Sequence, residues 1–170
     1  MMKKQIRQGV FETNSSSTHS ICIAKNTELS IPKSLHFEFG EFGWERNILH
    51  SVGEKASYLY TGLIANNRKD DFDRIIHFLK DKGIEVTAEE PIYKKFTYEG
   101  NDGGEYAENG GYVDHSYEMA EFLDAVCQDE GQLMRYLFSN LSFIITGNDN
   151  DDEDVSIDVS YEYDGYYKGN

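Results

Sequence analysis

Apolar residues recur along this 170-residue chain with two different periods, which limit the folds that it can adopt. In four segments they return every three or four residues, the spacing of one helix face. These segments are 52–67, 70–83, 117–127 and 132–138. Other segments alternate apolar and polar residues, as half-buried strands do. The chain has about the length of one domain and shows both the helical and the strand period. We therefore predict a single α+β domain spanning residues 1–170, with about four helices and a mainly antiparallel sheet.

The strand-type segments are short, and the most regular of them is close to the end of the chain. From Val155 to Asp164 apolar and polar residues alternate throughout. An acid-rich connection joins this segment to the apolar run 141–146, which predicts a hairpin. Residues 99–111 are rich in glycine and acid and are expected to form a loop. The other expected strands are 10–11, 19–25, 35–39, 84–87 and 92–98.

The chain lacks the sequence features of a membrane or secreted protein. No apolar run approaches the ~18 residues that cross a bilayer, and the basic start at Lys3 and Lys4 leads into polar residues instead of an apolar signal region. Two cysteines, Cys22 and Cys127, are too few for a disulfide framework. We therefore expect a cytoplasmic protein with free thiols.

The formal net charge of −15 is distributed very unevenly along the chain. Residues 1–95 hold 14 Lys or Arg and 13 Asp or Glu, whereas residues 96–170 hold two Lys or Arg and 18 Asp or Glu. The second part would repel nucleic acid and attract basic partners, such as a nucleic-acid channel on another protein. The alternative is that these acids simply keep a small domain soluble.

The end of the chain interleaves tyrosines with acids, a composition suited to contact with a basic protein. The run 149–154 does not fit a helix-loop-helix calcium loop, because Asp154 stands where glycine is needed and Ser160 where glutamate is needed. The alternative interpretation of the terminal alternation is an ordinary half-buried strand. The candidate partner-binding residues are Asp151, Asp152, Glu153, Asp154, Glu162, Tyr163, Asp164 and Tyr166.

The segment 9–20 is the most unusual stretch for chemistry. Five consecutive small polar residues, 14–18, are flanked by Glu12 and His19, a combination that supplies a hydroxyl nucleophile, a carboxylate and a base. The alternative is that these residues cap local backbone groups in a tight connection. The chain has no glycine-rich phosphate cradle and no phosphate-binding lysine motif, which argues against a nucleotide-hydrolysing enzyme.

Two short pairs contain the residue types that bind zinc, His19 with Cys22 and Asp114 with His115. A strand does not point residues three apart to the same side, so His19 and Cys22 bind one ion only if a turn intervenes. The chain has no Cys-x-x-Cys pair and no His-Glu-x-x-His helix. Spacing alone therefore gives weak support for a zinc site.

The segment Phe11–Ser20 resembles the opening of a group of small phage and prophage proteins, which also show the Gly-Glu-Phe-Gly-Trp-Glu stretch found here at Gly40–Glu45. Val113–His115 and Ile145–Asp149 look like later parts of the same pattern. The resemblance implies a phage-encoded type II-A anti-CRISPR protein. Such a protein would bind the type II CRISPR RNA-guided effector nuclease and block loading of target DNA.

The same resemblance implies one zinc ion, with His19, Asp114 and His115 as the positions for its ligands and Cys22 as a less secure fourth. A competing hypothesis is a metal-dependent nuclease or other hydrolase acting on guide RNA or other nucleic acid. Its acid, base or metal centre would be formed by Glu12, His19, Asp114 and His115. The two hypotheses differ in a measurable way, because a binding protein leaves the guide RNA intact.

Overall fold

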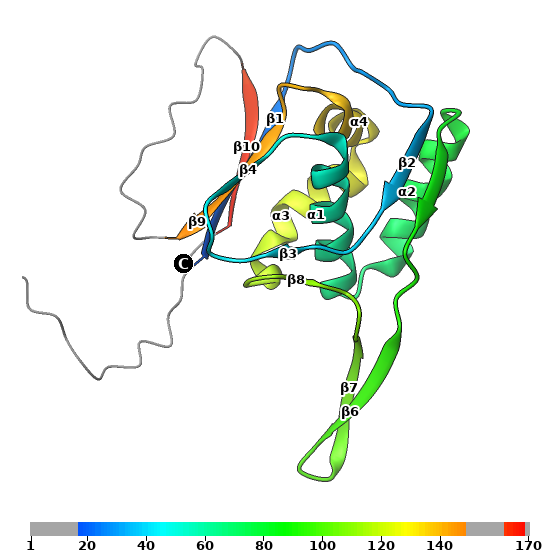
Figure 1. Ribbon diagram of the computed structural model, residues 1–170, viewed down its shortest axis with the longest axis vertical. Coiled ribbons are helices and arrows are strands. Elements are labelled where there is room, and N and C mark those ends of the chain that lie inside the picture. Colours follow the sequence, from blue (N-terminus) through cyan, green and yellow to red (C-terminus); the bar gives the residue numbers. More distant parts are fainter. Residues whose placement is uncertain (1–16, 149–161, 169–170) are drawn as a thin grey trace, which may run out of the picture.

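The computed structural model describes residues 17–148 and 162–168, and its largest sheet is built from both ends of that range (Figure 1). Its strand order is β10-β1-β9-β4, with every neighbouring pair antiparallel. The four strands are β1 (Ser17–Ala24), β4 (Asn47–Leu49), β9 (Phe143–Asn148) and β10 (Tyr163–Lys168). The centre of this main sheet therefore joins segments that are more than a hundred residues apart in the chain.

The helices lie on one side of the main sheet, with α1 in the middle of the molecule (Figure 1). Helix α1 starts at a capping box, in which Ser51 and Glu54 each accept a hydrogen bond from the other's backbone N–H. It contacts α3 and α4 as well as β2 and α2, so it is buried along most of its length. The helices are α1 (Val52–Ala65), α2 (Lys69–Asp81), α3 (Ala120–Gln128) and α4 (Glu130–Phe138), and the short 3-10 helix η1 (Ser116–Met119) precedes α3.

Three two-stranded sheets complete the described part of the chain. The first two are parallel pairs, and the third is an antiparallel hairpin that extends away from the rest of the molecule (Figure 1). The pairs are β2 (Ser34–Phe37) with β5 (Glu85–Ala88), β3 (Glu41–Phe42) with β8 (Tyr112–Val113), and β6 (Tyr93–Tyr98) with β7 (Asn101–Ala107). The single α+β domain with four α-helices and a main antiparallel sheet confirms the predicted fold class.

The prediction of a loop over residues 99–111 is wrong for Asn101–Ala107, which form β7. Tyr98 pairs with Asn101, so that Glu99 and Gly100 form a two-residue hairpin turn in which φ is 48° and 79°. Positive φ at both positions is the geometry of the tight turns that match strand twist. A high glycine and acid content indicated a loop, but here it belongs to β7 and its turn.

The hairpin predicted between the apolar run 141–146 and the last strand is wrong, because β1 lies between β9 and β10 in the main sheet. Two further differences from the expected elements concern short strands and strand ends. Strand β4 was not predicted, because three residues are too few for a recognisable alternation. Strand β10 continues to Lys168, beyond the expected end at Asp164, because its pairing with β1 extends to His19. The expected strand 10–11 and the first part of 155–164 lie outside the described residues.

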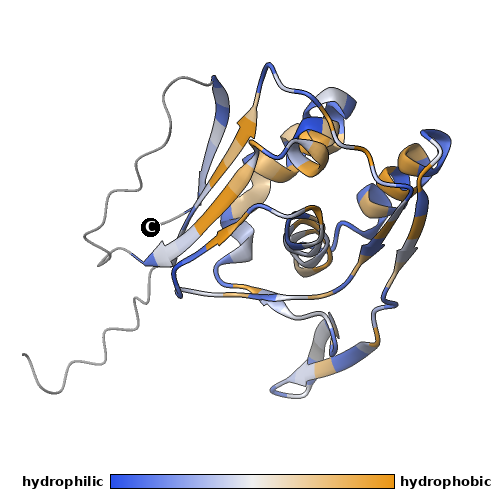
Figure 2. Cartoon of the chain, turned by 45° about the horizontal axis from the view of Figure 1, so that its top comes forward, coloured by the Kyte–Doolittle hydropathy of each residue, from blue (hydrophilic) through white to orange (hydrophobic). Residues whose placement is uncertain are grey.

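The core is aromatic, and the buried side chains beside it include Lys55. The ring of Phe122 lies 5.0 Å from that of Tyr136 and 6.3 Å from that of Tyr58. Lys55, only 1% exposed, donates from Nζ to the carbonyls of Ser139 at 2.6 Å and Ser142 at 3.1 Å. This lysine thereby ties α1 to the segment that follows α4. Figure 2 shows the apolar residues gathered on the middle strands of the main sheet and on the neighbouring helices.

None of the helices in the described ranges is long and apolar enough to span a membrane.

Candidate functional site

The main sheet carries a buried polar cluster at one end of the face that packs against the helices. In the strand register His19 of β1 lies opposite Thr146 of β9 on one side and Lys168 of β10 on the other. Directly opposite residues share a face of the sheet. All three side chains are at most 2% exposed, so this cluster is part of the interior.

His19 uses both of its ring nitrogens within the protein. Nδ1 lies 2.8 Å from the hydroxyl of Tyr58, and Nε2 lies 2.9 Å from the carbonyl oxygen of Gly43. A carbonyl can only accept, so Nε2 carries the hydrogen and the neutral ring accepts from Tyr58 at Nδ1. Burial lowers the pKa of His19 from 6.5 to about 4, against a smaller opposing effect of its bond to Gly43. The ring is therefore neutral at pH 7.

Lys168 is the second ionisable group of the cluster. Its Nζ donates to the backbone oxygen of Ser17 at 3.0 Å and to the Ser17 hydroxyl at 2.7 Å. Burial lowers the pKa of Lys168, while the negative charges of Glu118 and Asp114 act in the opposite direction. Lysine, two carboxylates and the neutral histidine thus influence one another electrostatically.

Asp114 lies in the turn between β8 and η1, and Glu118 lies in η1 itself. The Asp114 N–H donates to the carbonyl of Phe42 at 2.8 Å, which places this turn beside the loop that contains Gly43. His115 has a left-handed backbone with φ 52°, uncommon for a residue other than glycine. Its Nε2 lies 3.8 Å from Asp114 Oδ1, and its Nδ1 lies 3.8 Å from Glu118 Oε1. The imidazole therefore separates the two carboxylates, whose oxygens lie beside different ring nitrogens.

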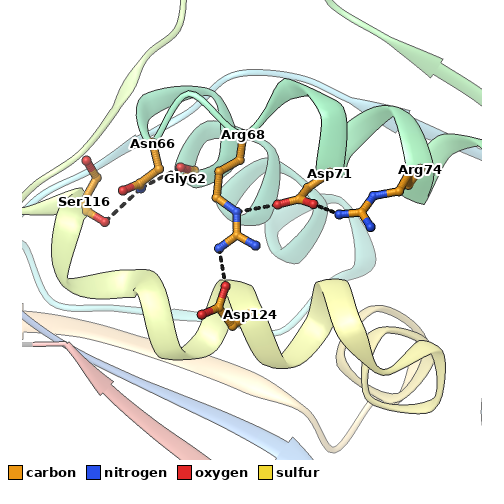
Figure 3. Close-up of polar contacts among 7 residues, drawn as sticks. All are labelled: Gly62, Asn66, Arg68, Asp71, Arg74, Ser116 and Asp124. Atoms are coloured by element: carbon orange, nitrogen blue, oxygen red, sulfur yellow. Dashed lines mark hydrogen bonds and ion pairs between the residues drawn. The ribbon is translucent and has the colours of Figure 1, made fainter.

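A polar network holds this turn against the helices (Figure 3). The side-chain amide of Asn66, at the end of α1, donates to the Gly62 carbonyl at 2.8 Å and to the Ser116 carbonyl at 2.9 Å. Arg68 pairs with Asp124 of α3 at 2.7 Å and also contacts Asp71, which in turn pairs with Arg74. These contacts fix η1 and α3 relative to α1 and α2.

The described parts of the four segments that carry the family resemblance meet around His19. The His19 ring donates to Gly43, in the second segment, and Asp114 of the third is hydrogen-bonded to Phe42. Thr146, in the fourth, is the partner of His19 in the register and donates from its hydroxyl to the Glu45 carbonyl at 2.6 Å. Separate short motifs in the sequence therefore form one continuous polar cluster.

The zinc ligands implied by the resemblance converge only in part. Asp114 lies close enough to raise the pKa of His19 slightly, and His115 is its neighbour in the turn. Cys22 lies three residues after His19 in the same strand, on the opposite face; it is 6% exposed, and burial raises the pKa of its thiol. Within 17–148 and 162–168 no three His, Cys, Asp or Glu side chains are arranged to bind a metal. His19, with both nitrogens engaged, does not fit a ligand role, and we assign no chemistry to a metal.

The alternative catalytic set is also incomplete. Glu12 lies outside the described residues, and His19 is fully buried. Sequence reasoning missed the contact between the Ser17 hydroxyl and the Lys168 amine, a pairing that some hydrolases use to activate a serine. Both residues are 1% exposed, so a substrate has no access to this hydroxyl in the described arrangement. The scarcity of lysine and arginine after residue 95 was the one signal that could have singled out Lys168.

The predicted partner-binding residues divide into two groups. Asp151, Asp152, Glu153 and Asp154 lie outside the described residues. Of the others, Glu162 is exposed, but Asp164 pairs with Lys25 at 3.4 Å. Tyr166 donates to the Gln132 side chain at 2.9 Å, and the Tyr163 ring lies 5.8 Å from that of Phe143. Residues 163, 164 and 166 thus make contacts within the protein.

Comparison of the chain with protein-family models, with curated proteins and with solved structures found no match.

Proposed function

We propose that this protein is a phage-encoded, non-enzymatic inhibitor that works in the host cytoplasm. It binds a basic nucleic-acid path on a type II CRISPR effector nuclease and blocks loading of target DNA. The observation that carries the proposal is the separation of charge along the chain. The family resemblance of the segments around His19 suggests the identity of the effector.

The basic and acidic side chains after residue 95 differ in their exposure. Lys168 and Arg135 are the only basic residues after residue 95; Lys168 is 1% exposed and Arg135 is half-buried. Because Lys168 is buried and Arg135 is partly buried, these two side chains do not fully neutralise the exposed acids of residues 96–170. Among the described residues of this part, the exposed acids are Glu99, Glu105, Glu108, Glu121, Asp124, Asp129, Glu130 and Glu162. Two of them pair with basic residues from the first part of the chain, Asp124 with Arg68 and Glu108 with Lys94.

The buried cluster supports binding over catalysis. A general base must reach the proton that it removes, and the nitrogens of His19 are occupied by Tyr58 and Gly43. Lys168 is likewise held by the hydroxyl and carbonyl of Ser17. We therefore attribute a structural role to the cluster, which joins the main sheet, α1 and the turn before η1.

Binding of the effector loaded with guide RNA tests the proposal. Attraction between exposed charges is screened over ~10 Å at 0.1 M salt and ~3 Å at 1 M salt, so the dissociation constant is expected to rise steeply with ionic strength. Biolayer interferometry over a salt series measures this. Absence of association at low salt contradicts the proposal.

A matched pair of charge variants sharpens the experiment. Replacing Glu121, Glu130 and Glu162 by glutamine removes three exposed charges from the acidic part, and it is expected to slow association. The same change at exposed Glu28, Glu38 and Glu85 removes three charges from the balanced part and is expected to have a smaller effect. Gel analysis of the guide RNA after incubation completes the test, since cleaved RNA would favour the hydrolase.

A further inference from the structure

We infer that the β6–β7 hairpin is the element that enters the basic surface of the partner. This inference rests on the proposed function and names the surface through which it acts. The hairpin extends from the body of the molecule as a two-stranded ribbon (Figure 1). Two-stranded ribbons are marginally stable by themselves in water, so an extended one gains from a partner that covers it.

Large apolar side chains are concentrated on and beside this hairpin. Among the described residues twelve large hydrophobic side chains are exposed, and five of them lie within residues 92–106. Exposed apolar surface gathered in one place marks interaction sites, and tyrosine and phenylalanine are enriched at the centres of protein interfaces. The five are Ile92 at 57%, Tyr93 at 42%, Phe96 at 49%, Tyr98 at 69% and Tyr106 at 48% exposed.

The aromatic side chains are held in place by the hairpin itself. Phe96 lies opposite Gly104, and a Cβ on that glycine would come within 3.2 Å of the Phe96 ring. The ring therefore packs across the glycine backbone, a contact that larger residues would obstruct. The Tyr106 ring lies 6.2 Å from that of Phe96. Because these rings are already ordered in the free protein, binding a partner would cost less conformational entropy.

A hollow of about 360 Å³ opens beside Phe96. It is lined by Lys95, Phe96, Thr97, Gly103, Gly104 and Glu105, and Lys95 lies opposite Glu105 in the strand register. An aromatic ring, a carboxylate and an amine therefore border the same space. Arginine stacks on aromatic rings and pairs with carboxylates. The Phe96 ring and the Glu105 carboxylate therefore offer contacts to an arginine side chain of a partner, which would lie beside Lys95.

The charge of the hairpin tip selects the class of partner. Residues 96–107 contain three acidic residues and no Lys or Arg, and the two lysines of the hairpin, Lys94 and Lys95, lie near its base in β6. This sign disfavours nucleic acid, and the formal charge of −15 on every chain disfavours a second copy. A basic, arginine-bearing protein surface is the complementary occupant, and it is the same kind of surface that the proposed function requires.

The test compares a double variant, Phe96→Ser with Tyr106→Ser, with a control, Trp44→Ser, which removes an aromatic residue 58% exposed outside the hairpin. We expect the double variant to weaken binding to the guide-loaded effector on the order of tenfold or more, mainly through faster dissociation. The control is expected to bind like the wild type. Melting temperatures show whether each variant remains folded, and hydrogen exchange of residues 93–107 shows whether the partner covers the hairpin.

The outcomes separate this inference from the proposed function. Equal binding by wild type and double variant overturns the inference and leaves the proposed function standing. If the wild type does not bind the effector, the proposed function fails. The inference about the hairpin is then tested separately, by NMR titration of the protein with a synthetic arginine–glycine peptide. Shifts confined to residues 92–107 support the hairpin as a basic-ligand surface, and shifts elsewhere or none overturn it. A wild-type dimer that the double variant abolishes, or binding of nucleic acid to the hairpin, also overturns it.

Discussion

Lowering the pH from 7 to 4 is expected to reduce the free energy of unfolding by about 3 kcal/mol through His19 alone. The pKa of His19 is about 4 in the folded protein and 6.5 in an unfolded chain. Between these values the unfolded chain binds a proton that the folded protein does not, so stability falls as the pH falls. The contribution is complete above pH 6.5 and is lost progressively down to pH 4.

Urea unfolding at several pH values, on wild type and His19→Gln, measures this contribution. Glutamine has no titrating group, and its amide can donate to the Gly43 carbonyl in place of Nε2. Carboxylates distant from His19 titrate alike in both proteins, so the difference between the two curves reports His19 together with the groups coupled to it, such as Asp114. Parallel stability curves for the two proteins between pH 6.5 and 4 would show that His19 is accessible and protonates normally in the folded state.

Truncating Lys55 to alanine is expected to lower the free energy of unfolding by about 3 kcal/mol at pH 7. The change leaves a cavity and removes the donor to the carbonyls of Ser139 and Ser142. Burial also lowers the pKa of Lys55 from 10.5 to about 8. Between these values the folded protein releases a proton that the unfolded chain keeps, so the contribution of Lys55 to stability rises with pH.

The matched control is Lys55→Met, which preserves most of the volume and has no titrating group. The stability of the wild type relative to this variant is expected to rise by about 2 kcal/mol between pH 7.5 and 10. Because burial raises the pKa of Tyr58, Tyr60 and both thiols in either protein, their titration cancels in the comparison. A constant difference between wild type and Lys55→Met over this pH range would contradict a buried amine, as would an alanine variant as stable as wild type.

Local pattern was sufficient to predict the elements that bury one regular face. Helix α2 follows its apolar stripe at Phe72, Ile75 and Leu79, which are at most 5% exposed, and it ends before Gly83 with φ 83°. The hairpin at 93–107 was only half predicted, because the sequence of β7 contains just two apolar residues, Tyr106 and Ala107, and therefore shows no alternation.

The candidate site depends on long-range pairing, which the sequence indicates only indirectly. The two histidine-containing motifs suggested that His19 and the turn at Asp114 lie close together, and the structure brings them into one cluster. Lys168 joins the cluster because β10 pairs with β1 in a register that sets it opposite His19. A one-residue shift would turn Lys168 to the other face, and no local pattern determines that choice. Tyr58 contributes its hydroxyl to the cluster from α1. In the sequence it cannot be distinguished from an ordinary core tyrosine.

An order-of-addition experiment tests the central claim most directly. The protein is added to the guide-loaded effector either before or after a labelled target DNA duplex, and bound DNA is measured by fluorescence anisotropy at low salt. If the acidic surface occupies the path of the DNA, addition before the duplex abolishes DNA binding, whereas addition after it leaves the bound DNA in place and the guide RNA intact. Unchanged DNA binding in both orders, or loss of DNA binding that accompanies cleavage of the guide RNA, would contradict the account.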